Sequence, residues 1–156
     1  MEIPRENVQS YPRPPLIEAV PHRLTIHLGG ALVADTTRAW RICETHHAPT
    51  YYLPPEHVKA RLTPCAGSSF CEWKGRARYY DVTAGGVTAR RAAWAYDAPV
   101  PRYAALAGHL AFYPGLMERC SVAGLEVIPQ PGDFYGGWVT PNLDGIVKGG
   151  PGTRGW

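Results

Sequence analysis

The residues best suited to chemistry lie in the short stretch from Cys71 to Gly75. Lys74 follows the thiol of Cys71 by three residues, and Arg76 and Arg78 come soon after. Nearby cations favour the thiolate form, which makes Cys71 a candidate nucleophile. The competing interpretation is that Cys71 packs as a small buried side chain, the commoner role of a cytosolic cysteine. A nucleophile also needs a base, and four histidines are available for it: His46, His47, His57 and His109.

Glu44 is the second candidate catalytic residue. It follows the apolar Trp40, Ile42 and Cys43, so we expect it at a strand end that faces a pocket. A partly buried carboxylate holds a proton more readily than an exposed one and can act as a general acid or base. The alternative is a structural ion pair, for which Lys74 is the natural partner. We predict that Cys71, Glu44 and Lys74 face one cavity.

Aromatic side chains are the most conspicuous feature of the sequence, and most of them should pack in the core. Adjacent tyrosines on a strand point to opposite faces, so we expect that not all are buried and that some line a groove. With Lys and Glu nearby, such rings suit a planar or anionic ligand. The residues predicted to bind it are Tyr51, Tyr52, Trp94, Tyr96, His109 and Tyr113.

Several other chemistries find little support. Nucleotidyl transfer usually needs paired carboxylates around Mg²⁺, but no Asp-x-Asp or Glu-x-Glu pair follows Gly67-Ser68-Ser69. The cysteines are spaced 22, 6 and 49 residues apart, which does not match a zinc knuckle. We therefore predict no metal site, although a looser set of Cys71, His109 and Glu44 stays open. The sequence leaves it unknown whether a cofactor is bound.

The elements that must position these residues are mostly strands. Leu24–Leu28 alternates between apolar and polar residues, and Gly29-Gly30 predicts a hairpin turn into residues 31–34. A second hairpin is expected from Arg76–Val82 through Gly85-Gly86 to Val87–Tyr96. Further strands are predicted near residues 39–43, 50–53, 109–113 and 125–128, with one short helix from Pro54 that ends by Pro64 and another within 101–108. The fold class is therefore mainly β, a small antiparallel domain with one or two short helices.

Proline and glycine divide the chain into three parts. Five prolines in residues 1–22 predict an extended arm without regular structure. Residues 23–128 form the predicted β domain. Residues 129–156 are rich in Gly and Pro but hold Phe134, Tyr135, Trp138 and Trp156, so we expect this extension to pack on the domain.

The composition limits which cellular compartment and which classes of partner we expect. The 156 residues carry a net charge of +3, which is too small to indicate nucleic acid. No apolar segment long enough for a signal sequence or a membrane span is present, so we expect a cytoplasmic protein with reduced cysteines and no membrane contact.

The order of several short motifs resembles the domain-of-unknown-function family 427 (DUF427), which is also filed under a nucleotidyltransferase-like name. The motifs are Glu44-Thr45, Pro49-Thr50-Tyr51-Tyr52, Cys71-Glu72-Trp73-Lys74-Gly75, Ala92-Ala93-Trp94-Ala95-Tyr96, Pro99 and Ala111-Phe112-Tyr113. The resemblance covers about residues 23–118 and implies a β-tent-like architecture. It implies no activity, because none is securely assigned to the family.

Three functions remain open from the sequence. The first is a small-molecule binding domain, with or without catalysis. The second is a protein-interaction module that uses the arm and the extension, and a homo-oligomer is compatible with it. The third is a binder of single-stranded nucleic acid that uses Arg76, Arg78, Arg90 and Arg91, which the modest net charge disfavours.

Overall fold

A computed structural model describes residues 3–71, 74–132, 135–150 and 153. The mainly β prediction is confirmed: the strands form small sheets that are antiparallel except for one two-residue pair. Within these ranges the helices are short 3₁₀ turns at Val8–Ser10, Pro55–His57, Pro101–Leu106 and Pro114–Leu116.

The first sheet has the strand order β12-β11-β3-β4. It contains the predicted glycine hairpin, β3 (Leu24–Leu28) and β4 (Ala31–Thr36), together with β11 (Arg119–Val122) and β12 (Leu125–Glu126). The alternation seen in the sequence is real, because Leu24, Ile26 and Leu28 are buried while the residues between them are half-buried.

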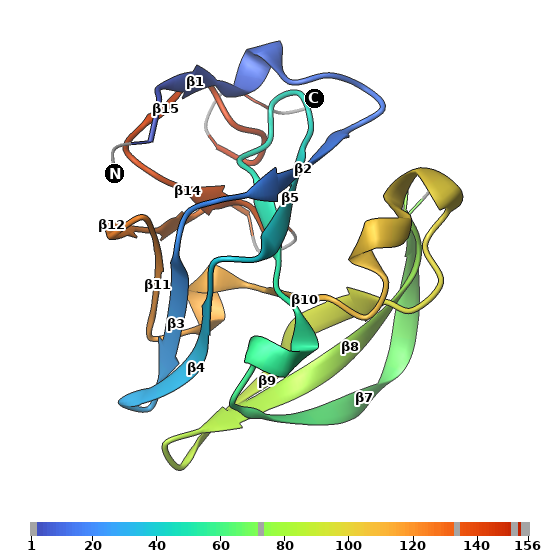
Figure 1. The fold of residues 1–156 in the computed structure, drawn as a ribbon, viewed down its shortest axis with the longest axis vertical. Helices are drawn as coiled ribbons and strands as arrows, with labels where there is room; N and C mark the ends of the chain where they lie inside the picture. The colour runs from blue at the N-terminus through green and yellow to red at the C-terminus, as the bar shows by residue number, and fades with distance from the viewer. Residues whose placement is uncertain (1–2, 72–73, 133–134, 151–152, 154–156) are drawn as a thin grey trace.

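The second sheet has the order β10-β9-β8-β7 and carries most of the candidate site. Its long strands are β7 (Arg61–Cys71), β8 (Gly75–Ala84) and β9 (Val87–Tyr96), with the short β10 (Leu110–Phe112) at one edge. The second predicted hairpin is thus confirmed. The tips of the two hairpins meet (Figure 1), and a Cβ atom at Gly85 would lie 2.0 Å from the carbonyl oxygen of Gly29, so this contact requires glycine.

The third sheet corrects the prediction for the N-terminal arm. Its order is β2-β5-β6, with β2 (Leu16–Val20) pairing along all of β5 (Ala39–Cys43) and with β6 (Thr50–Tyr52) on the other side. The prolines around Leu16–Val20 bound a strand instead of preventing one. Two further pairs are small: β1 (Glu6–Asn7) lies parallel to β15 (Leu143–Asp144), and β13 (Ile128–Pro129) is antiparallel to β14 (Trp138–Val139).

The prediction between residues 54 and 71 is also corrected. A single 3₁₀ turn replaces the expected helix, and β7 begins at Arg61 although the strand contains Pro64 and Gly67. Proline is tolerated there because β7 is an edge strand, whose outward N–H groups need no ladder partner.

Apolar side chains form two clusters on opposite sides of the second sheet. One contains Leu24, Ile26, Val33, Phe112 and Trp138, among others. The other is richer in aromatic rings and contains Ile42, Tyr52, Ala77, Trp94, Tyr96, Tyr103, Leu106 and Ala111. Both faces of β9 are therefore covered near its end, which explains the unbroken apolar run Ala92–Tyr96.

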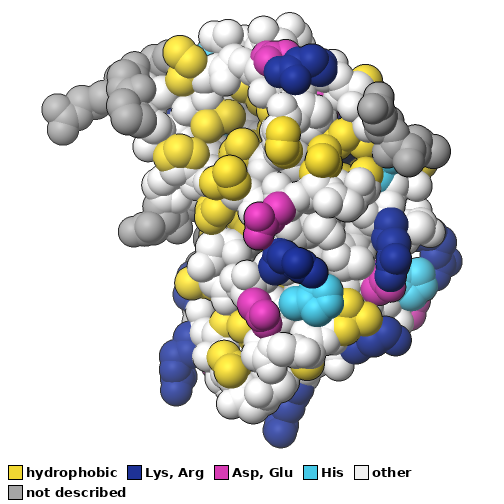
Figure 2. Space-filling model, turned by 90° about the vertical axis from the view of Figure 1, so that its left-hand side faces the viewer, with side chains coloured by type: hydrophobic (Ala, Val, Ile, Leu, Met, Phe, Trp, Pro, Cys, Tyr) yellow, Lys and Arg dark blue, Asp and Glu magenta, His cyan; other side chains and the backbone are white. Residues whose placement is uncertain are grey.

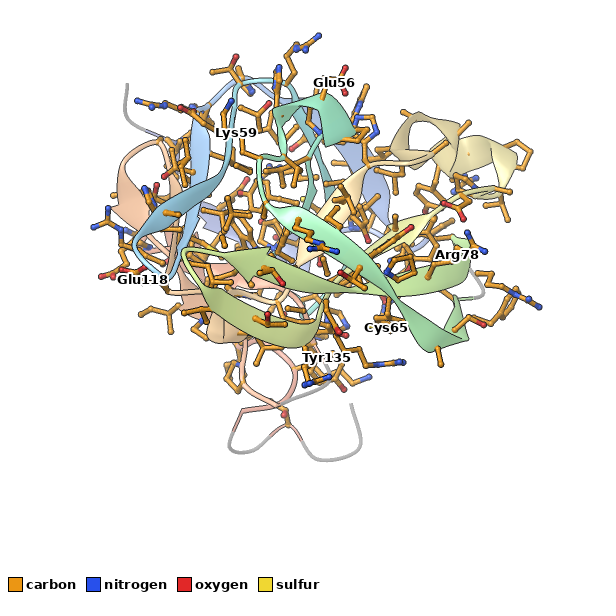
Figure 3. The ribbon with its side chains drawn as sticks, turned by 90° about the horizontal axis from the view of Figure 1, so that it is seen from below. Glu56, Lys59, Cys65, Arg78, Glu118 and Tyr135 are labelled. Atoms are coloured by element: carbon orange, nitrogen blue, oxygen red, sulfur yellow. The ribbon has the colours of Figure 1, made fainter. Side chains whose placement is uncertain are left out.

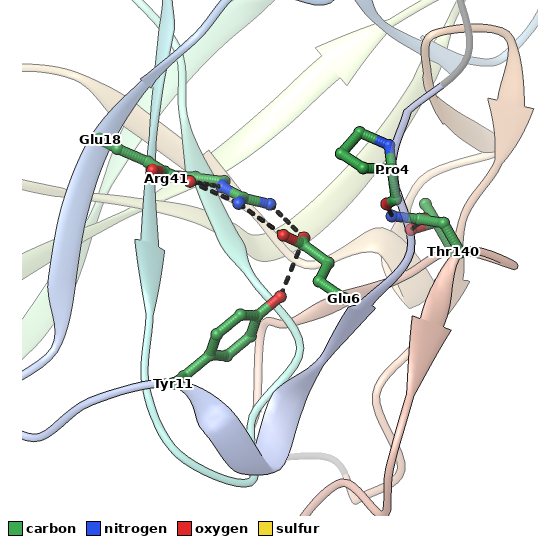
Figure 4. Close-up of polar contacts among 7 residues, drawn as sticks. Pro4, Glu6, Tyr11, Glu18, Arg41 and Thr140 are labelled. Carbon is green, nitrogen blue, oxygen red and sulfur yellow. Dashed lines mark hydrogen bonds and ion pairs between the residues drawn. The ribbon is translucent and has the colours of Figure 1, made fainter.

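A charged network fastens the start of the chain to the third sheet (Figure 4). The guanidinium of Arg41 donates from Nη2 to Glu6 at 2.9 Å and from Nε to Glu18 at 2.6 Å, and Tyr11 donates to Glu6 at 3.0 Å. Burial alone would raise the pKa of Glu6, but the bonds from Arg41 and Tyr11 bring it below its usual value.

The C-terminal extension packs on the domain through Trp138. This side chain is fully buried, its ring centroid lies 5.0 Å from that of Tyr51, and its indole N–H donates to the carbonyl of Phe112 at 3.1 Å. Phe134 and Trp156 lie outside the described residues. On the face seen in Figure 2, apolar side chains gather in the upper half and most charged ones lie below.

Candidate functional site

Among the described residues, Glu44 and Lys74 do not form the ion pair that was the structural alternative to their catalytic role. Cys71 is half-buried against the aromatic cluster, near Tyr52 and Tyr96. Lys74 places its Nζ atom 5.9 Å from the ring centroid of Tyr96. Glu44 has a different partner, because its Oε2 atom lies 3.8 Å from Nε of Arg13.

Four of the six predicted ligand-binding residues belong to this aromatic cluster. The ring centroids of Tyr52 and Trp94 lie 6.4 Å apart, those of Tyr52 and Tyr96 6.2 Å, and those of Trp94 and Tyr113 4.6 Å. Tyr52, Trp94 and Tyr96 are buried, and only Tyr113 is half-exposed. Most of these rings therefore support one another and present little surface to a ligand.

Tyr51 and His109 lie elsewhere. Tyr51 points to the other apolar cluster, so the adjacent tyrosines do split between two faces, as expected, yet both are buried because β6 is covered on both sides. The other adjacent pair, Tyr79 and Tyr80, is half-buried and lines surface hollows, so the expectation that not all such tyrosines are buried is confirmed there. His109 lines a separate shallow hollow beside Trp40 and Pro54.

Two bulges flank Tyr79 and Asp81 in the central strand β8. On the β7 side, the register passes from Pro64–Tyr80 to Ser68–Arg78, so residues 65–67 oppose the single residue Tyr79. On the β9 side it passes from Tyr80–Ala93 to Val82–Ala89, so residues 90–92 oppose Asp81. Bulges redirect side chains and are common beside binding sites.

The carboxylate of Asp81 ties the two bulges together. It accepts the backbone N–H of Arg91 at 2.8 Å and the thiol of Cys65 at 3.0 Å. These two donors hold the pKa of Asp81 below its usual value, the Cys65 bond being the larger effect. The bulged geometry is thereby fixed by a side chain that stays ionised at neutral pH.

Arg91 is the residue that this arrangement redirects. Its φ is +50°, a left-handed conformation that a non-glycine residue adopts at a cost of about 1–2 kcal/mol. Its guanidinium carbon lies 3.9 Å from the ring centroid of Tyr79, and the hydroxyl of Tyr79 is 2.7 Å from that of Ser69. The strained backbone of Arg91 thus positions its guanidinium over the ring of Tyr79 at the molecular surface.

A groove of about 680 Å³ opens beside this stacked pair. Tyr79, Arg90, Arg91 and Tyr113 line it from the sheet, and burial followed by the neighbouring Tyr79 raises the pKa of Tyr113 to about 12. Among the described residues, no carboxylate lies within 4.0 Å of either arginine guanidinium. The groove therefore combines aromatic rings with cations that lack an acidic partner in the part of the chain that is described.

The C-terminal extension supplies the opposite wall, through Gln130 and Tyr135. A Cβ atom at Gly136 would lie 2.2 Å from the indole of Trp94, so glycine is needed where the extension crosses the aromatic cluster. Tyr135 is marked in Figure 3, which views this side of the second sheet from below. The groove is therefore completed only when the extension is docked.

His47 contacts the extension through Gln130 and Tyr135. The side chain of Gln130 is 3.2 Å from His47 Nδ1 and donates to the carbonyl of Lys148 at 2.9 Å, and the rings of His47 and Tyr135 meet edge to face at 5.3 Å. Burial, followed by the charges of Lys148, Lys74 and Arg13, lowers the pKa of His47 to about 4. His47 is neutral at physiological pH, and the cations around it add to the positive character of this region.

The cysteines and metal-binding residues give no further site. All four thiols are free, and burial raises the pKa of Cys43 and of Cys120 to about 12, so these two are unreactive. Within the described ranges, no three His, Cys, Asp or Glu side chains lie close enough to hold a metal ion.

Residues 16–123 match a family described as a domain of unknown function, DUF427. The chain belongs to this family. The DUF427 match begins with β2, seven residues before the predicted boundary at 23, in agreement with the strand found there. No curated protein matches the chain. In the ranges that the structure covers, no helix has the length and apolar character needed to cross a membrane.

Tyr79 was not among the predicted site residues, and Arg91 was predicted only for the nucleic-acid function. The signal was present, because Arg90-Arg91 places two charged residues in succession within a strand whose alternation they break. A break of that kind indicates a bulge, although the sequence alone does not show which way the extra residue points.

Proposed function

We propose that this DUF427 domain binds a small, planar, anionic ligand in the groove between β9 and the C-terminal extension. The observation that carries the proposal is the stacked pair of Arg91 and Tyr79 at a strained bulge, beside Arg90 and Tyr113. A ligand ring would lie against Tyr113 or Tyr79, and its acidic group would pair with the guanidinium groups.

Size and charge support a small molecule. The groove volume of about 680 Å³ falls within the roughly 300–1,000 Å³ of small-molecule sites. Tyr113 is held in place by its contact with Trp94, so it offers a fixed ring surface without further ordering. Leu116 and Pro129 add apolar surface at the rim.

The predicted catalytic roles of Cys71, Glu44 and Lys74 stay predictions. The ion pair that would have linked Glu44 to Lys74 is replaced by the contact with Arg13, and Lys74 lies at the margin of a packed cluster. The geometry therefore favours binding as the function. A catalytic role can be tested once the ligand is identified.

Thermal unfolding with matched probes tests the proposal. The probes are adenosine monophosphate against adenosine, flavin mononucleotide against riboflavin, and salicylate against salicylamide. We expect the anionic member of at least one pair to raise Tm and its neutral partner to leave Tm unchanged, because only the former pairs with Arg90 and Arg91. No shift with any anion, or equal shifts within every pair, would contradict the proposal.

An oligothymidylate probe distinguishes the alternative. Binding of this single strand with no response to the small anions would favour the nucleic-acid function. In that case substitution of Arg76 and Arg78, which lie outside the groove, should weaken binding as much as substitution of Arg91.

A further inference from the structure

The strand β7 leaves one side of the second sheet unpaired. It is the last strand in the order β10-β9-β8-β7, and no other described strand pairs with its outer edge. A free edge presents backbone N–H and C=O groups to which another extended chain can add.

The two halves of this edge differ. The first half contains Pro64 and the bulge at residues 65–67, which are devices that discourage strand addition. The second half, Ser68–Cys71, is regular in its pairing with β8 and carries Phe70, whose side chain is 77% exposed. Edge strands that resist strand addition usually carry charged residues or proline, whereas this edge exposes a large aromatic ring.

Charged residues lie on the same face as Phe70. In the antiparallel register Phe70 pairs with Arg76 and Ser68 with Arg78, and paired residues project from one face of a sheet. A hollow of about 440 Å³ lies beside them, lined by Ser68, Arg76 and Arg78, and none of its described lining residues is acidic. Arg78, labelled in Figure 3, contacts the exposed carboxylate of Asp97 at 3.1 Å.

We propose that the edge Ser68–Cys71 receives an extended acidic segment of a partner protein as an added strand. Backbone hydrogen bonds would hold the segment, an apolar side chain would cover Phe70, and an acidic side chain two residues away would enter the hollow. Neighbouring strands lie about 4.8 Å apart, so the acid and Arg78 would face each other across one strand. Ser68 lies between them and is small enough to let the two long side chains meet.

The charges select this occupant over a second copy of the chain. Pairing of β7 with the β7 of another copy would bring Arg76 and Arg78 of both copies into the same region, and like charges disfavour that contact. An acidic segment instead neutralises Arg76, which forms no ion pair within the described part of the chain.

Fluorescence anisotropy with labelled peptides tests the proposal on the full chain. The probes carry the core Val-Thr-Glu-Thr or its reverse order Thr-Glu-Thr-Val between glycines, and matched probes carry Lys in place of Glu. We expect saturable binding of at least one acidic probe, roughly tenfold tighter than its lysine counterpart, which is the effect of one or two charge pairs.

Variants locate the contact. Phe70→Ser and the double change Arg76→Glu with Arg78→Glu should each weaken binding at least about fivefold. Val87→Ser, which removes another exposed apolar side chain near the β8–β9 turn, should leave binding unchanged, and circular dichroism confirms that all variants are folded. Absence of binding, equal binding of acidic and lysine probes, or equal effects of all variants would overturn the proposal. A wild-type dimer that Phe70→Ser dissociates, without peptide binding, would overturn it in favour of self-association.

Discussion

Arg91 has a strained backbone conformation and also supplies a cation to the proposed binding site. Its left-handed φ, its backbone bond to Asp81 and its stacking on Tyr79 all depend on the same bulge. A residue selected only for stability at that position would be glycine, because glycine adopts positive φ without steric cost. The presence of arginine therefore indicates that its side chain is used.

Replacing Arg91 by glycine and by alanine separates strain from binding. Arg91→Gly relieves the left-handed strain whereas Arg91→Ala retains it, so the glycine variant should be the more stable by about 1 kcal/mol. Both variants lose the guanidinium and should lose affinity for anionic probes equally. Urea unfolding measures the first difference and calorimetric titration the second. A glycine variant less stable than the alanine variant would show that the bulge is not strained.

The lowered pKa of His47 predicts that the free energy of unfolding decreases at acid pH. Its pKa is lowered to about 4 in the folded chain, against about 6.5 when unfolded, so below pH 6.5 the unfolded chain binds a proton that the folded chain does not. The stability present above pH 6.5 should fall by on the order of 2 kcal/mol as the pH falls toward 4.

Replacement by a residue that does not titrate isolates this effect. His47→Gln should lose less stability than the wild type between pH 7.5 and 4.5 in urea unfolding. Effects of the carboxylates are common to both proteins and cancel in the comparison, and the measurement at pH 7.5 gives the cost of the replacement itself. An unchanged pH dependence in the variant would rule out the lowered pKa.

Among the strands and turns, the sequence predicted those that depend on local residue preferences. Gly29-Gly30 and Gly85-Gly86 marked both hairpins correctly, because these turns need positive φ at both central residues. β2 and β7 were missed because Pro15, Pro21 and Pro64 read as breaks in local structure. What makes these segments strands is their pairing with β5 and β8, which is a long-range contact that no local pattern reports.

Of the residues predicted to bind a ligand, only Tyr113 lines the proposed groove. Tyr52, Trp94, Tyr96 and Tyr113 do cluster as their strand positions implied. The groove itself arises where two bulges and the extension meet, and those depend on register and on packing between distant segments.

The charged network around Arg41 should determine how the first residues attach. Arg41→Met leaves Glu6 and Glu18 partly buried without a cation, which should destabilise the fold by roughly 2–3 kcal/mol. It should also speed proteolysis before β2. Arg5→Met breaks the exposed pair with Asp144 and is the matched control, for which we expect no measurable change in stability. Equal effects of the two changes would contradict a special role for the Arg41 network.

At the scale of the whole molecule, the C-terminal extension is part of the domain although it lies beyond the DUF427 match. Trp138 is fully buried between Tyr51 and the carbonyl of Phe112, and Gly136 crosses Trp94. The extension therefore couples overall stability to the shape of the groove.

Truncation after Gly132 should lower Tm and abolish binding of anionic probes together. Trp138→Ala should cost roughly 3–5 kcal/mol, the usual effect of removing a buried aromatic ring, and Trp138→Phe should cost less because a ring remains against Tyr51. Differential scanning calorimetry checks both. An unchanged Tm in the truncated chain would mean that the extension is not docked in solution.

The central claim is that Arg91 and the tyrosines beside it form a binding site for a planar anion. Isothermal titration with adenosine monophosphate and flavin mononucleotide tests it most directly, on the wild type, Arg91→Ala and the control Arg119→Ala. Arg119 is an exposed arginine on β11 outside the groove, so both variants lose the same net charge. We predict that at least one probe binds the wild type and Arg119→Ala alike and binds Arg91→Ala at least about tenfold more weakly, as expected for loss of a charge-assisted contact. Equal affinity of all three proteins, or no binding to the wild type, would contradict the claim.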